Sequence, residues 1–134
     1  MEKTILFESL SPNVIVDDVN KSVEYYTINL GFSLIASMPG SGHRDWAMVM
    51  RDSVTMMFQS LDSLQHDLPT LKITAKGSLG TFYLKVKGLD QLFALAKTNR
   101  LEMAVDMRTT FYGAREFAIK DPDGYFLMFA EDVK

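Results

Sequence analysis

The chain repeats its own pattern at an offset of about 70 residues. A shift of 70 aligns Val16 with Val86, and one further residue of slip aligns Phe58 with Phe129. A repeat constrains the architecture before any local prediction. Two copies of a small unit, each unable to bury its own apolar face, predict two half-sheets that close around a shared cavity. Such a cavity is where we expect the function.

Each copy has the pattern strand, helix, then three strands. In the first copy, Asp18 is a good N-cap, apolar residues follow at helical spacing, and Gly31 is typical of a helix end. In the second copy, the stretch 121–124 (Asp-Pro-Asp-Gly) is a strong turn between the last two strands. The predicted helices span 19–30 and 89–96, and the predicted strands span 11–16, 32–38, 46–50, 54–59, 81–86, 102–107, 115–120 and 125–130.

The length and composition predict a single ordinary globular domain. We assign residues 1–134 to one domain, with a first module at about 9–60, a linker at about 61–78 that contains a helical turn near 61–64, and a second module at about 79–131. The net charge of −3 gives no basic surface for nucleic acid. The absence of cysteine excludes disulfides and thiolate chemistry, and no segment is long and apolar enough for a membrane span. We therefore expect a cytoplasmic protein.

Three motifs in register carry a resemblance to a known family. They are Val-Asp-Asp-Val at 16–19 leading to Leu-Gly-Phe at 30–32, Tyr-Gly-Ala-Arg-Glu-Phe at 112–117, and Asp-Pro-Asp-Gly-Tyr at 121–125. With the repeat, they resemble the vicinal oxygen chelate superfamily, which includes glyoxalases, extradiol dioxygenases and bleomycin-resistance proteins. The resemblance implies an α+β fold, in which two tandem βαβββ modules form a cupped mixed sheet with helices on its outer face, in a homodimer.

The resemblance also implies where metal-using relatives place their ligands. Counting from the motifs puts these positions on Ser11, Thr81, Met57 and Met128. Hydroxyl and thioether groups do not suit a hard divalent cation, which needs imidazole or carboxylate donors. We therefore expect no metal and no other cofactor.

Within the superfamily, the chain is most similar to the bleomycin-resistance branch. The segments 45–55, 86–90 and 113–117 carry this similarity. It implies a dimer that binds a small molecule without metal or turnover and acts by sequestration. The loop 39–44 departs from that branch, because it contains Gly, His and Arg rather than an acidic run. This departure weakens the case for bleomycin itself, a cationic drug, as the ligand.

Strand alternation predicts which side chains line the cup. Large polarizable residues alternate with Ala47 and Val49, and an inward carboxylate at Glu116 would orient a ligand, act as a base, or pair with a nearby charge such as Arg115. The predicted ligand-binding residues are Ser11, Asn13, Trp46, Met48, Met57, Thr81, Tyr83, Phe111, Glu116 and Met128.

Two alternatives remain open. The first is a glyoxalase- or dioxygenase-like metalloenzyme with displaced ligands, which would need His43 or His66 to enter the cup, although both are expected in exposed loops. The second is a structural dimer whose cup is filled by its own side chains.

Overall fold

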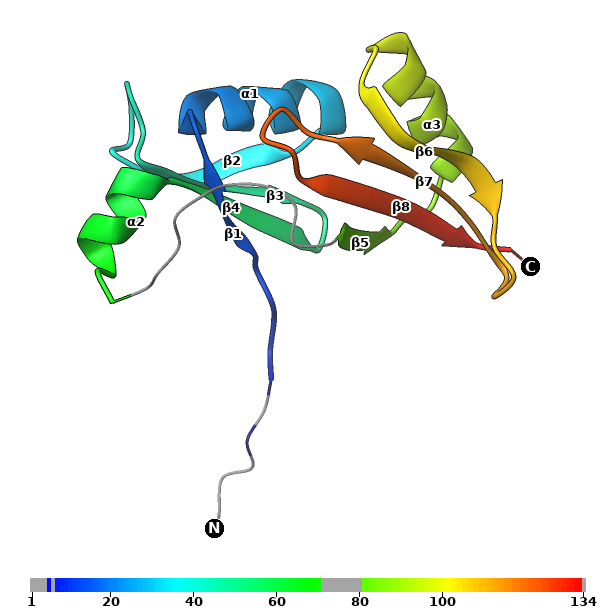
Figure 1. The fold of residues 1–134 in the computed structure, drawn as a ribbon, viewed down its shortest axis with the longest axis horizontal. Coiled ribbons are helices and arrows are strands. Elements are labelled where there is room, and N and C mark those ends of the chain that lie inside the picture. Colours follow the sequence, from blue (N-terminus) through cyan, green and yellow to red (C-terminus); the bar gives the residue numbers. More distant parts are fainter. Residues whose placement is uncertain (1–4, 6, 71–80, 134) are drawn as a thin grey trace. The chain divides into compact units, whose positions relative to one another are not determined.

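The computed structural model describes residues 5, 7–70 and 81–133, which fall into two compact units that divide at residue 71 (Figure 1). The first unit is a four-stranded sheet with strand order β1-β4-β3-β2 and two helices. Its elements are β1 (Asn13–Val16), α1 (Val19–Leu30), β2 (Ser33–Met38), β3 (Trp46–Arg51), β4 (Val54–Ser60) and α2 (Leu61–Asp67).

The second unit repeats this topology, with strand order β5-β8-β7-β6. Its elements are β5 (Thr81–Lys85), α3 (Leu89–Thr98), β6 (Glu102–Thr109), β7 (Ala114–Lys120) and β8 (Phe126–Asp132). In both sheets the first strand lies parallel to the last, and the remaining pairs are antiparallel. The α+β fold of two tandem βαβββ modules is therefore confirmed.

The register confirms the internal repeat residue by residue. Phe58 of β4 pairs with Ala47 of β3, and Phe129 of β8 pairs with Phe117 of β7. All four side chains are buried. The aligned positions of the two copies thus occupy equivalent places in the two sheets.

Helix α1 covers one face of the first sheet. The Asp18 carboxylate accepts a hydrogen bond from the Lys21 backbone N–H at 3.1 Å, and the helix ends at Gly31 with a φ of 70°. Both are as predicted. The buried ring of Tyr26 lies 4.8 Å, centroid to centroid, from the ring of Phe58. This packing fixes which face of the sheet is core and leaves the opposite face for other contacts.

Helix α3 covers the equivalent face of the second sheet, but its N-terminus is capped differently. Gly88 precedes the helix and has no side chain to cap it, so Glu131 of β8 accepts from the backbone N–H groups of Gly88 and Leu89. The ring of Phe93 lies 5.1 Å from that of Phe117. A carboxylate at this position also complements the helix dipole.

The structure corrects the predicted linker. Instead of a single turn near 61–64, α2 runs over seven residues, because Ser60 caps it through the Ser63 N–H and Leu64 packs into the core. Residues 71–78 of the predicted linker lie outside the described residues. The first strand begins at Asn13 rather than residue 11, and the last begins after Tyr125. Within the described part of the chain, no helix is long and apolar enough to cross a membrane.

Candidate ligand-binding site

The first sheet has a face that α1 does not cover, and the residues predicted for the cup lie on it. Asn13 pairs with Met57, which pairs on its other side with Met48, so the three side chains form one row across the sheet. The neighbouring row contains Trp46 opposite Gln59. The Ser11 hydroxyl lies beside this face and hydrogen-bonds the Thr55 hydroxyl. The structure therefore brings together all five predicted residues of the first unit.

Gln59 joins this face to helix α2. Only 5% of its surface is exposed, yet its amide is fully engaged. Its Oε1 accepts from Asn13 Nδ2 at 2.8 Å, and its Nε2 donates to Ser63 Oγ at 3.0 Å and to Asp67 Oδ2 at 3.1 Å. A buried amide is stable only when it has such partners. These bonds hold α2 at the end of β4.

A pocket of about 860 Å³ opens between the end of the sheet and α2. Its volume lies in the range of small-molecule sites in proteins, roughly 300–1,000 Å³. Trp46 supplies an aromatic surface, and the row Met38–Trp46–Gln59 crosses three strands beneath it. The residues that line it are Ser37, Met38, Pro39, Gly40, Asp45, Trp46, Gln59, Asp62, Ser63, His66 and Asp67.

Three of the side chains that line this pocket are carboxylates. Asp45, Asp62 and Asp67 contribute carboxylates, and the described lining residues include no Lys or Arg. Within the described part of the chain, none of the three carboxylates forms a salt bridge. Like-charged groups in a concave site raise the local concentration of ions of opposite sign. An aromatic ring beside them adds a cation–π surface.

The loop 39–44 beside the pocket is hydrogen-bonded to helix α1 and to strand β2, which precedes it. Asn20 of α1 donates to the Gly42 carbonyl at 2.8 Å and accepts from the Arg44 backbone N–H at 3.0 Å. The Arg44 side chain turns back to Ser37 Oγ at 3.0 Å. Its Nη2 also donates to the Gly40 carbonyl at 3.5 Å, so the guanidinium bonds two residues of the pocket lining, Ser37 and Gly40, although Arg44 itself does not line the pocket.

The second sheet has an equivalent face, opposite α3, and it carries the other predicted residues with one exception. Thr81, Tyr83 and Met128 share this face through the pairing of β5 with β8. Glu116 lies on it too, since it alternates with Phe117, whose ring packs on α3. The exception is Phe111, whose side chain is fully exposed in the turn between β6 and β7.

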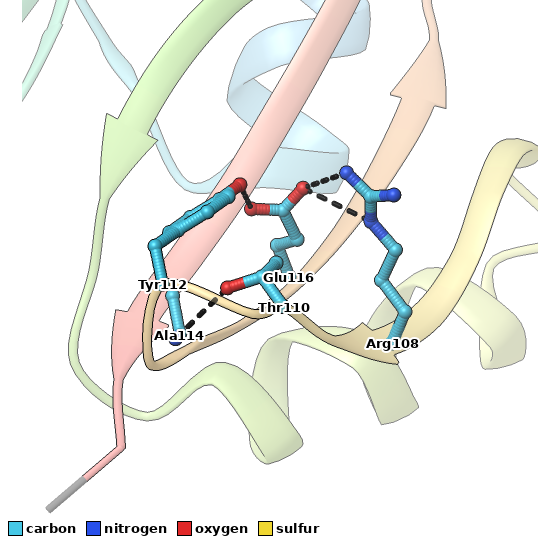
Figure 2. A network of polar contacts seen from close by, with 5 residues as sticks. All are labelled: Arg108, Thr110, Tyr112, Ala114 and Glu116. Atoms are coloured by element: carbon cyan, nitrogen blue, oxygen red, sulfur yellow. Dashed lines mark hydrogen bonds and ion pairs between the residues drawn. The ribbon is translucent and has the colours of Figure 1, made fainter.

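Glu116 is the centre of a polar network on this face (Figure 2). Its Oε2 accepts from Arg108 Nη2 at 2.6 Å and from Arg108 Nε at 3.1 Å, and its Oε1 accepts from the Tyr112 hydroxyl at 2.6 Å. Only 1% of Glu116 is exposed. Thr110 Oγ1 accepts from the Ala114 backbone N–H at 3.0 Å, which closes the turn that carries Tyr112.

The network changes the acidity of all three ionisable side chains. Burial acts to raise the pKa of Glu116, but the hydrogen bonds from Tyr112 and Arg108 and the charge of Arg108 outweigh it, so the pKa is lowered. The hydrogen bond from Tyr112 to Glu116 is the main cause that raises the pKa of Tyr112. The hydrogen bonds from Arg108 to Glu116 are likewise the main cause that raises the pKa of Arg108. At neutral pH the carboxylate is therefore ionised, and the phenol keeps its proton.

Sequence reasoning missed several of these contacts. Arg115 was named as one possible partner of Glu116, but it points to the other face and pairs with Asp90 at 2.8 Å, and the nearby charge that pairs with Glu116 is that of Arg108. The pairing of Arg108 with Glu116 across β6 and β7 follows from a hairpin register that the local pattern does not define. His66 was expected in a loop, whereas it lies on α2 and lines the pocket; Ser60 followed by Asp62 in the first turn was the available helix signal.

The residues present do not fit a divalent metal. The four positions implied by metal-using relatives, Ser11, Met57, Thr81 and Met128, carry two hydroxyls and two thioethers. Among the described residues, no three His, Cys, Asp or Glu side chains are grouped so that they could hold an ion. Glu116 already uses both of its oxygens within the protein.

Comparison with known proteins agrees with this architecture. Residues 9–129 match the model of the Glyoxalase/Bleomycin resistance protein/Dioxygenase superfamily. The chain belongs to this superfamily. It is 26% identical over 131 residues to proteins named Bleomycin resistance protein from Geobacillus stearothermophilus and Staphylococcus aureus, with 92% of this chain and 96% of each relative covered.

Solved structures show the same fold at lower identity. TioX from Micromonospora sp. ML1 superposes with a TM-score of 0.75 at 15% identity, covering 95% of this chain and 98% of that chain. A glyoxalase/bleomycin resistance protein/dioxygenase from Nocardioides gives a TM-score of 0.76 at 18% identity, covering 98% of this chain and 87% of that chain. These likenesses establish the fold of the superfamily member described here.

Proposed function

We propose that this superfamily member binds a small organic molecule without a metal ion and acts by sequestering it. The observation that carries the proposal is the pocket beside Trp46, whose volume suits such a ligand. The relatives named Bleomycin resistance protein support a binding role rather than turnover. The hydroxyl and thioether groups at the implied metal positions support independence from metal.

The lining of the pocket favours a cationic ligand with a planar body. Asp45, Asp62 and Asp67 supply negative charge, and Trp46 supplies the aromatic surface. A cation held over a tryptophan ring gains about 0.5–2 kcal/mol, with the larger value when water is excluded. The predicted face with Met48 and Met57 extends the polarizable surface of the same sheet.

Titration of the intrinsic fluorescence tests this proposal, because Trp46 is the only tryptophan of the sequence. Bleomycin and a panel of cationic and neutral planar compounds serve as probes. We expect saturable quenching by cationic members. Asp45→Asn and Asp62→Asn together should weaken it by roughly tenfold, while the exposed Asp52→Asn in the β3–β4 turn should leave it unchanged. If no probe gives a saturable signal, the binding role is refuted.

Metal independence has a separate test. Any ligand that binds only the native state raises the melting temperature as its concentration rises. We expect no saturable increase with zinc, nickel, manganese or ferrous ions added to the purified protein. A stoichiometric stabilisation by one of them would contradict this part of the proposal and favour a metalloenzyme.

We also propose that the protein is a homodimer. The described residues expose several large apolar side chains, with Phe7 94%, Leu10 90% and Phe111 100% exposed. Two edge strands in each sheet also need covering. Sedimentation at micromolar concentration should give twice the mass of 15.1 kDa for one chain. A stable species of 15.1 kDa would refute the dimer.

A further inference from the structure

The network around Glu116 does more than the sheet requires for stability. A buried ion pair is commonly no more stable than apolar residues of similar volume, because both charges lose their hydration. Here the face of the second sheet nevertheless contains a carboxylate that is 99% buried, between Arg108 and Tyr112. Such networks are often found where a side chain must be held in one orientation for a ligand.

Glu116 holds Arg108 in a defined orientation. A single oxygen, Oε2, accepts from both Nε and Nη2, so the plane of the guanidinium is fixed from one side. Figure 2 shows the third nitrogen, Nη1, on the far side of the guanidinium from Glu116. The Arg108 side chain is 55% exposed, and within the described residues its only salt bridge is to Glu116. In the described part of the chain, no carboxylate is paired with its outer edge, which presents one N–H from each terminal nitrogen.

Among the described residues, no carboxylate other than that of Glu116 forms a salt bridge with Arg108. The Tyr112 hydroxyl donates a hydrogen bond to Glu116 Oε1 at 2.6 Å, keeps its proton, and also interacts with Arg108, whose pKa it helps to raise. Tyr83, which lies on the same face, is half exposed and interacts electrostatically with Tyr112. The outer edge of a guanidinium matches a carboxylate, with two parallel N–H···O bonds. Two half-exposed tyrosine rings on the same face suit an organic body rather than an inorganic ion.

We propose that the outer edge of Arg108 is a binding point for a small organic carboxylate, with Glu116 as the positioning residue that holds it. This inference concerns the second unit and does not depend on the acidic pocket of the first. It makes Arg108 a residue that selects ligands by an anionic planar group. Tyr112 contributes by occupying the second oxygen of Glu116, so that Arg108 is the only group that Oε2 must hold.

A binding experiment with three matched probes tests this inference. 2-Naphthoate is the anionic probe, 2-naphthamide is its neutral counterpart, and 2-naphthylmethylamine is its cationic counterpart. Binding is followed by NMR chemical shifts of the full-length protein. We expect naphthoate to bind at least tenfold more tightly than naphthamide. Arg108→Lys should remove most of this difference, because the ammonium group lacks the planar fork. Arg115→Lys, one residue from Glu116 but on the opposite face, should leave it unchanged.

The variant Glu116→Gln separates positioning from net charge. It makes the protein more positive by one unit, so simple charge attraction predicts tighter binding of naphthoate. If Glu116 positions Arg108, naphthoate should instead bind about fivefold to tenfold more weakly, because the neutral amide holds Arg108 less firmly than the carboxylate does. Tyr112→Phe, which changes no charge, gives a second measurement if Glu116→Gln does not fold. Equal binding of naphthoate and naphthamide, or unchanged or tighter naphthoate binding in these variants, would overturn the proposal.

Discussion

Replacement of Gln59 by methionine should lower the free energy of unfolding of the first unit by about 2 kcal/mol. The variant keeps the side-chain length and removes three hydrogen bonds, to Asn13, Ser63 and Asp67. Each such bond contributes about 1 kcal/mol net, so the loss is about 3 kcal/mol. Burial of a more apolar side chain at a position that is 5% exposed returns about 1 kcal/mol.

The assay is urea denaturation followed by the fluorescence of Trp46, which pairs directly with Gln59 across β3 and β4. The free energy is obtained by linear extrapolation. Gln65→Met is the matched control, because Gln65 lies exposed on α2 and methionine has a similar helix propensity. The control should remain within about 0.5 kcal/mol of the parent protein. If Gln59→Met also remains within that range, the bonds from Gln59 to α2 do not stabilise the unit as argued.

Other predictions concern single positions in the two units. Gly31→Ala should lower the free energy of unfolding by about 1–2 kcal/mol in the same urea assay, because φ is +70° and the new Cβ would lie 2.8 Å from Arg51 Nη1. Gly40→Ala is the control and should have almost no effect, because a Cβ there would meet open space. Glu116→Gln should change how the free energy of unfolding depends on pH. The lowered pKa of Glu116 stabilises the fold above its ordinary value of about 4.5, and this contribution is lost as the pH falls through the folded-state pKa. The stability difference from the parent, measured by circular dichroism in urea, should therefore shrink from pH 7 to pH 3; a constant difference would contradict this account.

The sequence predicts the elements well where local signals agree. The cap at Asp18 and the stop at Gly31 both define α1, and the predicted turn at 121–124 forms with a positive φ at Gly124. The predicted alternation along β3 is present, since Ala47 and Val49 are buried and the larger residues between them lie on the opposite face. These features depend on neighbours in the chain.

The parts that sequence reasoning missed depend on contacts between distant residues. Arg108 and Glu116 meet only through the register of β6 and β7, which contains two irregularities. The pocket needs α2 to be placed by Gln59, and the pattern of residues 61–67 gives only a weak helix signal. The place of Phe111 outside the sheet follows from the length of the β6–β7 turn. A period of two or 3.6 residues contains no information on any of these distances.

The parallel pairing of the first and last strands of each sheet affects how the chain folds while it is synthesised on the ribosome. Among the described strands, β1 is hydrogen-bonded only to β4, and β5 only to β8. Each of these first strands can therefore pair only after a strand more than 40 residues later has been synthesised. Contacts between distant residues form late in folding. The first unit can close once residue 60 has emerged, but a nascent chain that ends before residue 126 leaves Thr81–Lys85 as an unpaired apolar strand. We expect chains stalled in that interval to be the ones that chaperones bind and proteases remove.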